Sequence, residues 1–447
     1  MDIGNLEFPN KKAKRACLYA LKMFSRPSAI LIPKSTQETM QLYRERRLSM
    51  QYSDYVHTYF ATEHGWKYFI DFIDQISTLE PFASRATREE ILSEFKAAMT
   101  RSIKRGQFPE TIEELISEID ESFAISIKSH RERSFFKVLG VNIDINFPFA
   151  IGSCFLGRFN HLSIDHTFHS DPEFATATQK ALDSVFEEHT PVLISGISFG
   201  TSDICRVRNF ESSEIALSLL QVFINFSYER AFKNLGKIML FQRPEQGLSR
   251  QLDFSLVGTS SSLSDISINT KFASQDFKID LSLVKMWNTD MALWAINEVI
   301  FTNPESELFY RFINSLHFFR QAAFQSSCEL QLSTLWIAVE SIFTADSKKV
   351  KNANISALSA LTGRTIRQDH WPSGARTKEE LEATLAKNYD YRSRTFHHGR
   401  RGIVTETNVN EFSILVCNLI LSVAWAIHQG CSTLDDFICE PTFQVQQ

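Results

Sequence analysis

The sequence predicts an α+β protein of more than one domain, with a helical N-terminal region, a strand-rich middle region and an all-helical C-terminal bundle. Its 447 residues correspond to two or three domains at about 100–200 residues each. Only 16 Gly and 12 Pro interrupt the chain, which favours long helices, and 38 Phe supply a large aromatic core. From changes in pattern we place the domains at residues 1–133, 134–284 and 285–447.

The N-terminal region carries two helix-start signals of known mechanism. Thr87 with Glu90, and Thr111 with Glu114, have the spacing of capping boxes ahead of apolar runs. Gly106 stands where a helix C-cap is expected. These signals predict helices over much of residues 54–129.

Charge and cysteine usage predict a cytoplasmic protein with no membrane span. A net charge of -5 excludes a general polyanion binder, so any nucleic-acid contact requires a local basic patch. Seven scattered cysteines without a C-x-x-C pair are typical of reduced thiols. A basic run at residues 11–15 leads into an apolar stretch that Lys22 and Arg26 interrupt too early for a signal sequence, so we expect an amphipathic helix with a solvated end.

The middle region changes to strand-like alternation. We expect one helix at about residues 213–228 and a loop at 258–262. Strands are predicted at 138–147, 192–195, 204–208, 237–242, 251–257, 266–272 and 277–283. The pattern does not define their order in a sheet.

Residues 196–200 of this region match G-x-S-x-G directly after an apolar run. A nucleophile elbow requires a strand, a turn and then a helix, whereas residues 201–207 are predicted as a strand or loop. A hairpin with two glycines is therefore the better interpretation, and a serine hydrolase acting through Ser198 is a remote third function. Three histidines between 161 and 169 fit no zinc spacing, so we expect a polar loop, no metal site and no cofactor.

The C-terminal region has the 3.6-residue periodicity of packed helices. An apolar stripe including Trp336 and Val339 marks one helix, and Thr377 with Glu380 caps another. Helices are predicted at 287–301, 305–324 and 328–343, after the Thr377 cap, and at about 409–427.

A compact cationic patch at residues 388–401 is the strongest candidate for chemistry. It holds His397 and His398 among four arginines, namely Arg392, Arg394, Arg400 and Arg401. Arginine offers a planar fork for phosphate oxygens, and histidine exchanges protons near neutral pH. Together they supply what metal-free cleavage of an RNA phosphodiester needs. The alternative is a solvated basic helix end.

The spacing sets a geometric condition on such a site. On a straight helix Arg392 and His397 point about 140° apart, whereas Arg394 and His398 share a face. A site that joins Arg392 to His397 therefore needs a distorted turn, the long reach of arginine, or a second copy of the chain across a two-fold axis.

This patch, with the preceding LWIAVESIF helix and the capped terminal helix, resembles the Apea-like branch of the HEPN (higher eukaryotes and prokaryotes nucleotide-binding) families. Those families share an Arg-x4–6-His motif with a polar residue after the arginine. Arg392, Ser393 and His397 match it with four intervening residues, and His398 matches with five. Tyr389, three residues before the arginine, and Glu340 in the preceding helix also resemble that branch.

The resemblance implies a helical bundle that forms a homodimer through the motif helices and brings two Arg/His sets together. Many such proteins are metal-independent endoribonucleases of bacterial anti-phage defence or toxin systems, and others are non-catalytic nucleotide-binding or scaffolding modules. We therefore expect RNA as substrate, with Arg392 stabilising the transition state and His397 or His398 as general acid/base. The preceding regions are expected to sense a trigger from phage or cell. The alternative is a non-catalytic module that binds nucleotide or RNA, or mediates dimerisation.

Glu340 supports this site and has two possible interpretations. Glu340 lies one turn after Trp336 on an apolar stripe, so its carboxylate needs a partner. We expect it to orient Arg392 or Arg394, or to form an ordinary inter-helix ion pair.

The stretch 363–376 is predicted as a loop. Its Arg364, Arg367 and Trp371 have the composition of a surface that stacks single-stranded RNA. The alternative is a mobile surface loop with Trp371 tucked inward.

Overall fold

The computed structural model consists of two compact units. Unit 1 comprises Met1–Ser134 and Ile197–Phe210, and unit 2 comprises Phe135–Gly196 and Glu211–Gln447. The structure describes residues 6–45, 47–54, 56–129, 131–158, 192–227, 239–240, 252–259, 262–270, 277–302, 304–325, 327–343, 350–368, 371–398 and 404–439. Most described residues are helical, and the sheets are small.

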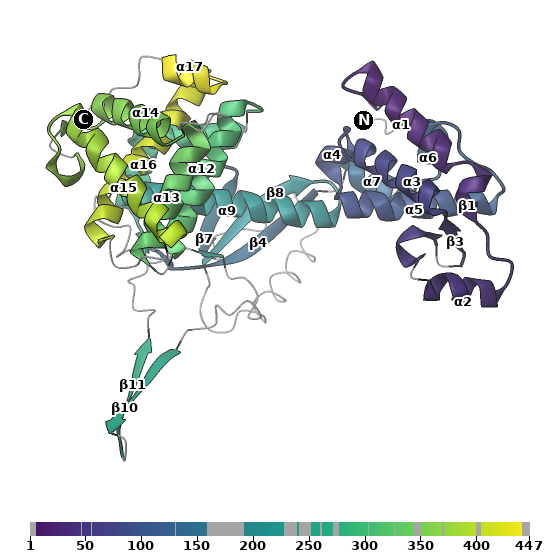
Figure 1. Cartoon of the computed structure of the whole chain (residues 1–447), viewed down its shortest axis with the longest axis horizontal. Helices are drawn as coiled ribbons and strands as arrows, with labels where there is room; N and C mark the ends of the chain where they lie inside the picture. Colours follow the sequence, from purple (N-terminus) through teal and green to yellow (C-terminus); the bar gives the residue numbers. More distant parts are fainter. Residues whose placement is uncertain are drawn as a thin grey trace. The chain divides into compact units, whose positions relative to one another are not determined.

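Unit 1 is a helical unit with one short antiparallel sheet (Figure 1). The strands are β1 (Ile30–Leu31), β2 (Gln51–Ser53) and β3 (Thr58–Ala61), in the order β1-β3-β2. The helices are α1 (Lys11–Phe24), α2 (Thr36–Arg44), α3 (Glu63–Ile76), α4 (Phe82–Arg85), α5 (Arg88–Lys104), α6 (Ile112–Ile116) and α7 (Glu121–Ser129), with 3-10 turns η1 (Pro27–Ala29) and η2 (Arg47–Met50).

The start signals of unit 1 act as the sequence indicates. The Glu90 backbone N–H donates to Thr87 Oγ1 (3.2 Å), and the Thr87 N–H donates to Glu90 Oε2 (2.8 Å). Thr111 and Glu114 form the same reciprocal box. Gly106 follows the end of α5 with φ +71°, where a Cβ is disfavoured.

An aromatic cluster fills the centre of unit 1. Phe24 of α1 packs edge-on against Phe69 and Phe72 of α3, with ring centroids 5.1 and 5.2 Å apart. All three side chains are fully buried, as is Tyr52 of β2, whose ring also packs on Phe69. The abundance of Phe in the composition is explained here by ring-on-ring packing.

Unit 2 combines a mixed sheet region with the C-terminal helices. One sheet has the order β6-β7-β8-β4-β9, β5 pairs in parallel with β12, and β10 and β11 form a separate antiparallel hairpin. The bounds are β4 (Arg131–Leu139), β5 (Val141–Ile143), β6 (Phe149–Ile151), β7 (Cys154–Arg158), β8 (Val192–Phe199), β9 (Met239–Leu240), β10 (Leu252–Thr259), β11 (Ser262–Thr270) and β12 (Phe277–Ile279).

The helices of unit 2 pack beside one another as the sequence predicts, with α12, α13, α15 and α16 adjacent (Figure 1). The described helices of this unit are α10 (Leu281–Thr289), α11 (Met291–Thr302), α12 (Glu307–Phe324), α13 (Cys328–Phe343), α14 (Val350–Thr365), α15 (Lys378–His398), α16 (Glu406–His428) and α17 (Leu434–Cys439). Helix α9 (Ser202–Ser227) has residues 202–210 in unit 1 and residues 211–227 in unit 2. The bounds of α13 coincide with those predicted.

Polar contacts join the middle strands and α9 to the C-terminal helices within unit 2. The Gly152 N–H donates to Asn297 Oδ1 of α11 (2.6 Å), and Glu214 of α9 pairs with Arg320 of α12. Residues 135–196 and 211–447 therefore belong to one unit, where the sequence analysis divides the chain into three domains.

Three predicted strands differ from the structure. The strand predicted at 138–147 is divided between the end of β4 and β5, with a break at Gly140, and residues 144–147 are not in a strand. Residues 204–208 lie in α9, because buried residues recur every three or four positions from Cys205 through Asn209 and Ser213. Five residues are too few to separate that period from alternation. Residues 277–283 divide between β12 and α10, which begins where Asp280 accepts the Leu283 N–H (3.0 Å).

Among the described helices, α16 alone is long and apolar enough to cross a membrane. In its most apolar stretch, 72% of the residues are buried inside the protein. That burial is typical of the core helix of a soluble protein.

Candidate functional site

The guanidinium of Arg392 lies at the contact between α15 and α13, held by the carboxylate of Glu340. Arg392 Nη1 donates to Glu340 Oε1 (2.7 Å) and Nη2 donates to Oε2 (2.8 Å). Both side chains are about four-fifths buried, with exposed fractions of 22% and 18%. Of the two partners considered for Glu340, the structure pairs it with Arg392, whereas Arg394 is exposed.

Tyr389 completes a three-residue cluster with this pair. Its hydroxyl donates to Glu340 Oε1 (3.1 Å) and accepts from Arg392 Nη1 (3.0 Å). The centre of the guanidinium lies 5.2 Å from the centroid of the Tyr389 ring. Burial, and then the negative charge of Glu340, raise the pKa of Tyr389, so the phenol stays neutral at physiological pH.

The core of the bundle positions this cluster. Trp336, one turn before Glu340 on α13, is fully buried. Its ring packs edge-on against Tyr389 (centroids 5.1 Å apart) and lies 4.6 Å from the ring centroid of Phe412 on α16. Three helices therefore fix where the phenol and the carboxylate stand.

One edge of the Arg392 guanidinium is left without a partner among the described residues. Nη1 donates twice and Nη2 once, while Nε is shielded from solvent and has no hydrogen-bond acceptor in the described part of the chain. Nε–H and the second Nη2–H lie on the same edge of the planar group. Two parallel N–H donors of this kind match two oxygens of a phosphate.

Lys351 of α14 adds a second cation beside the cluster. Its Nζ lies 2.5 Å from Asp390 Oδ1 and 5.8 Å from the Tyr389 ring centroid. Lys351 is not among the predicted site residues, because no helix is predicted at residues 350–362, where the structure has α14. The apolar spacing of Ile355, Leu358 and Leu361, all buried, is the signal that indicates α14.

The backbone of α15 is helical through His397 and His398. Arg392 and His397 are five positions apart, which on a regular helix places them about 140° apart around the axis and about 7.5 Å apart along it. No distorted turn joins these two positions in the described helix. Arg394 and His398 are one turn apart, and Ser393 is half-buried. The side chains of both histidines, and all of Arg400 and Arg401, lie outside the described residues.

The predicted loop at 363–376 is shorter than expected. Residues 363–365 complete α14, whose last turn presents Arg364 to solvent, and Arg367 is also exposed. Trp371 is half-buried, and its indole N–H donates to the Ile366 carbonyl (3.1 Å). This geometry agrees with the inward-tucked alternative for Trp371 rather than with an open stacking surface.

The G-x-S-x-G segment has a different local structure from that predicted. Strand β8 is followed by α9, so the segment leads into a helix rather than into a second strand. Ser198, however, lies within the strand, and its hydroxyl donates to the Cys205 carbonyl (3.0 Å). No described hydrogen bond joins it to a histidine.

Packing explains the glycine that ends this segment. Gly200 has φ +129°, and a Cβ there would collide with the Arg85 carbonyl oxygen. The residue is therefore required by a close backbone approach.

Among the described residues, no group of three or more His, Cys, Asp or Glu side chains is placed to hold a metal ion. The histidines between 161 and 169 lie outside the described residues.

Comparison of the chain with models of known protein families, with curated proteins and with solved structures finds no match. The resemblance to the HEPN families therefore rests on the motif and its helical context.

Proposed function

We propose that the C-terminal helices form a metal-independent endoribonuclease centred on Arg392. The observation that carries the proposal is the held guanidinium, whose Nη1/Nη2 edge is fixed by Glu340 while its Nε/Nη2 edge has no described acceptor. An unpaired buried donor costs free energy, and a phosphate oxygen that accepts from it would remove that cost.

The reaction is an internal transfer at a ribose 2′-hydroxyl. The 2′-oxygen forms a bond to phosphorus as a base removes its proton, and the bond from phosphorus to the 5′-oxygen breaks as an acid protonates that oxygen. The products are a 2′,3′-cyclic phosphate and a 5′-hydroxyl. Arg392 stabilises the charge on the non-bridging oxygens, and His397 or His398 exchanges the protons.

A homodimer is part of this proposal. Because Arg392 and His397 point in different directions on one regular helix, the acid and base are supplied most simply by a second copy of α15. The resemblance adds the setting, which is cytoplasmic defence against phage or a toxin system, with a trigger sensed by the rest of the chain.

Incubation of the purified protein with end-labelled RNA in EDTA tests the activity. We expect fragments that end in 2′,3′-cyclic phosphate, and loss of cleavage in both Arg392→Ala and His397→Ala. Arg394→Ala, which removes an exposed arginine two residues away, is the matched control. Cleavage that survives both substitutions, or that EDTA abolishes, would contradict the mechanism.

A non-catalytic module is the second candidate, because a bidentate Arg–Glu pair is also what an ordinary inter-helix contact looks like. In that case the same edge binds the phosphate of a nucleotide or RNA without turnover. Binding of RNA that Arg392→Ala weakens, with no cleavage by the native chain under any activating condition, would identify this function.

A further inference from the structure

Helix α1 of unit 1 carries a basic surface that the proposed RNase site does not use. Residues 11–26 contain six Lys and Arg and no acidic residue. All six side chains are exposed, and no described acidic side chain forms an ion pair with any of them. Lys14 lies over the Phe8 ring, with its Nζ 6.0 Å from the ring centroid, and within the described chain none of the six charges is neutralised by an acidic partner.

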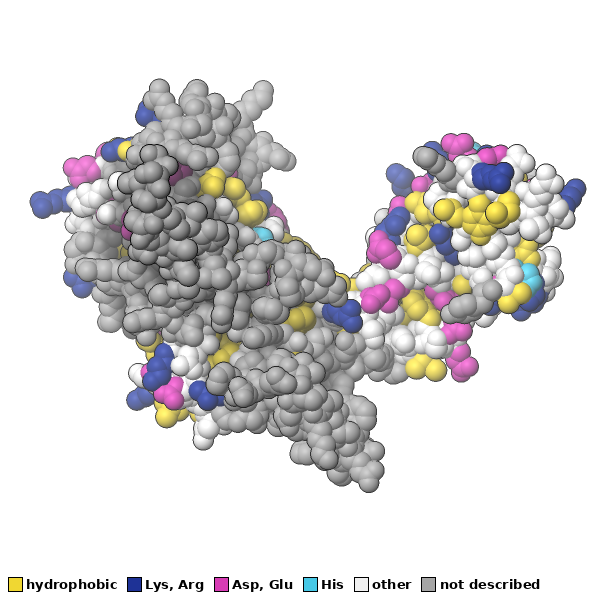
Figure 2. Space-filling view, turned by 90° about the horizontal axis from the view of Figure 1, so that it is seen from below, with side chains coloured by type: hydrophobic (Ala, Val, Ile, Leu, Met, Phe, Trp, Pro, Cys, Tyr) yellow, Lys and Arg dark blue, Asp and Glu magenta, His cyan; other side chains and the backbone are white. Residues whose placement is uncertain are grey.

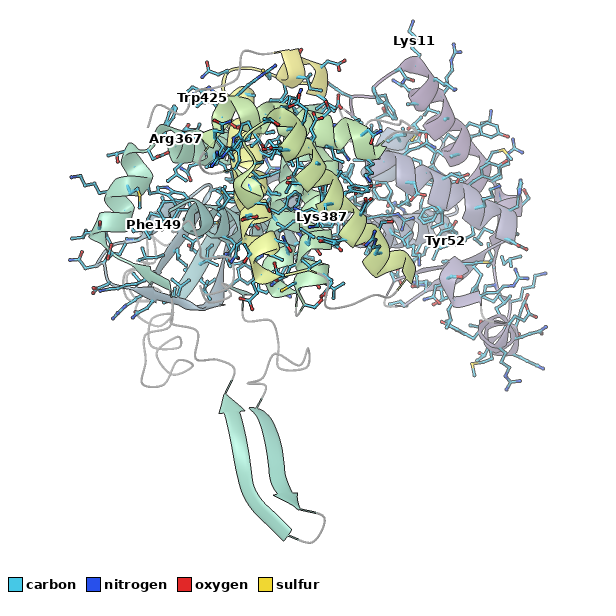
Figure 3. The ribbon with its side chains drawn as sticks, turned by 60° about the vertical axis from the view of Figure 1, so that its left-hand side comes forward. Lys11, Tyr52, Phe149, Arg367, Lys387 and Trp425 are labelled. Atoms are coloured by element: carbon cyan, nitrogen blue, oxygen red, sulfur yellow. The ribbon has the colours of Figure 1, made fainter. Side chains whose placement is uncertain are left out.

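Three of these six cations form a stripe along one side of the helix. Lys11, Arg15 and Lys22 recur at helical spacing, and Arg26 follows two residues after the helix ends. At 1.5 Å per residue, Lys11 and Arg15 are about 6 Å apart along the axis, and Lys11 and Lys22 about 16 Å. At the outer end of the helix, the Lys11 side chain points away from unit 1 (Figure 3).

The stripe is not a general property of the unit. On the face of unit 1 drawn in Figure 2, basic, acidic and apolar side chains are interspersed. In α1, by contrast, cations occupy the first turn, where the helix macrodipole disfavours them and where no acidic residue compensates. The arrangement lowers the stability of the helix.

Aromatic side chains adjoin the stripe. Tyr19 is 56% exposed, and its ring packs edge-on against Tyr68 of α3 with centroids 5.7 Å apart. Tyr68 in turn contacts the ring of exposed His64 (4.8 Å). A side-chain hydrogen bond with Tyr19 raises the pKa of Tyr68; the charge of exposed Asp71 raises it further, and the charge of Arg26 opposes the rise. The surface thus combines a row of cations with a row of rings.

A membrane surface does not fit this arrangement. Interfacial helices insert an apolar face between lipids. The apolar face of α1, which comprises Cys17, Ala20, Leu21 and Phe24, is already buried in the core of unit 1. The exposed side of α1 that remains for a partner carries the basic residues with Tyr19 and a single large aliphatic side chain, Leu18, which is too little apolar surface to insert between lipids.

We propose that the α1 stripe, defined as Lys11, Arg15, Lys22 and Arg26 with Tyr19, binds single-stranded nucleic acid. The cations contact successive phosphates, and Tyr19 stacks on a base, which is how sequence-tolerant single-strand sites are built. This site is separate from Arg392 and gives unit 1 a binding function of its own.

Fluorescence anisotropy of a labelled thymidine oligonucleotide with the full chain tests the stripe. DNA has no 2′-hydroxyl, so the result does not depend on whether the chain cleaves RNA. The triple variant Lys11→Gln, Arg15→Gln, Lys22→Gln should weaken binding, and its dependence of log K on log salt should be shallower by about 2, at about 0.7 per lost phosphate contact. The matched control Lys104→Gln, Lys128→Gln, Lys285→Gln removes the same charge from exposed lysines elsewhere and should leave the slope unchanged.

A second variant separates stacking from charge. Tyr19→Ala should weaken binding about tenfold with an unchanged salt slope, and Tyr19→Phe should restore it. No binding at low salt, equal losses in the triple variant and its control, or binding to phosphatidylserine vesicles in place of the oligonucleotide would overturn the proposal. Lys11→Gln removes a cation from the first turn of α1, which stabilises the helix, and Lys22→Gln removes one from its last turn, which destabilises it by a similar small amount. A folding defect is therefore not expected in the triple variant, and circular dichroism checks this.

Discussion

The cations of α1 in unit 1 and Arg392 in unit 2 stand in opposite surroundings. The cations of α1 are exposed and have no described acidic partner, whereas Arg392 of α15 is about four-fifths buried and held by two side chains. An exposed charge attracts a polyanion at long range, and salt screens that attraction. A charge held in one geometry instead fixes the orientation of the group that it binds. The comparison indicates that α1 is suited to capture a polyanion and α15 to act on one phosphate.

The largest effect is expected when Arg392 loses its partner Glu340. Glu340→Gln leaves the Arg392 guanidinium uncompensated, so we expect the free energy of unfolding of unit 2 to fall by about 2 kcal/mol. Five of the six tryptophans belong to unit 2, so tryptophan fluorescence during urea unfolding reports it. Glu307→Gln, which breaks the more exposed Arg311 pair, is the control and should cost less than about 0.5 kcal/mol. Equal losses of unfolding free energy in the two variants would mean that the Glu340–Arg392 pair contributes no more than an exposed ion pair.

A smaller effect is expected at the phenol. Tyr389→Phe removes the hydrogen bonds to Glu340 and Arg392, and should cost about 1 kcal/mol at neutral pH in the same urea experiment.

The pH dependence of that cost gives a second check. The pKa of Tyr389 is raised in the folded protein, so above its ordinary value of 10.0 the unfolded chain loses this proton while the folded chain keeps it. The native protein then loses stability as pH rises, and the phenylalanine variant lacks this loss. The difference between the two proteins should therefore shrink above pH 10, and a constant difference would contradict the raised pKa.

The smallest effect has the opposite sign and lies in unit 1. Lys11→Gln and Lys12→Gln remove cations from the first turn of α1, so each should raise the free energy of unfolding of unit 1 by about 0.3–0.5 kcal/mol at low ionic strength. Lys22→Gln, in the last turn of the same helix, should lower it. Urea unfolding followed by far-ultraviolet circular dichroism measures all three, and a loss of stability in Lys11→Gln would show that the stripe has a structural partner.

Local rules predicted what depends on local physics. The capping boxes at Thr87 and Thr111 and the apolar stripe around Trp336 each act over one or two turns, and the structure confirms the helices they mark. The need of Glu340 for a partner was also readable, because a carboxylate on an apolar stripe is costly unless paired.

The remaining features depend on tertiary contacts. The start of α9 was mistaken for a strand because the burial that distinguishes the two comes from residues distant in sequence. Lys351 was missed with the helix that carries it. Glu340 pairs with Arg392 rather than with Arg394 because of how α13 and α15 pack against each other. The spacing of residues in the sequence does not determine that packing.

The two hydrogen bonds between Glu340 and Arg392 determine whether lysine can replace this arginine. Both Nη atoms of Arg392 donate to the Glu340 carboxylate, and Nη1 also donates to the Tyr389 hydroxyl, so the plane of the guanidinium is fixed. An anion that binds Arg392 must therefore lie in that plane, at the Nε/Nη2 edge. Lysine at this position would carry the same charge on a single atom, with no second edge to offer once Glu340 is satisfied. The site therefore requires a cation that offers one edge to Glu340 and a second edge to an anion, and a lysine with the same charge does not replace arginine.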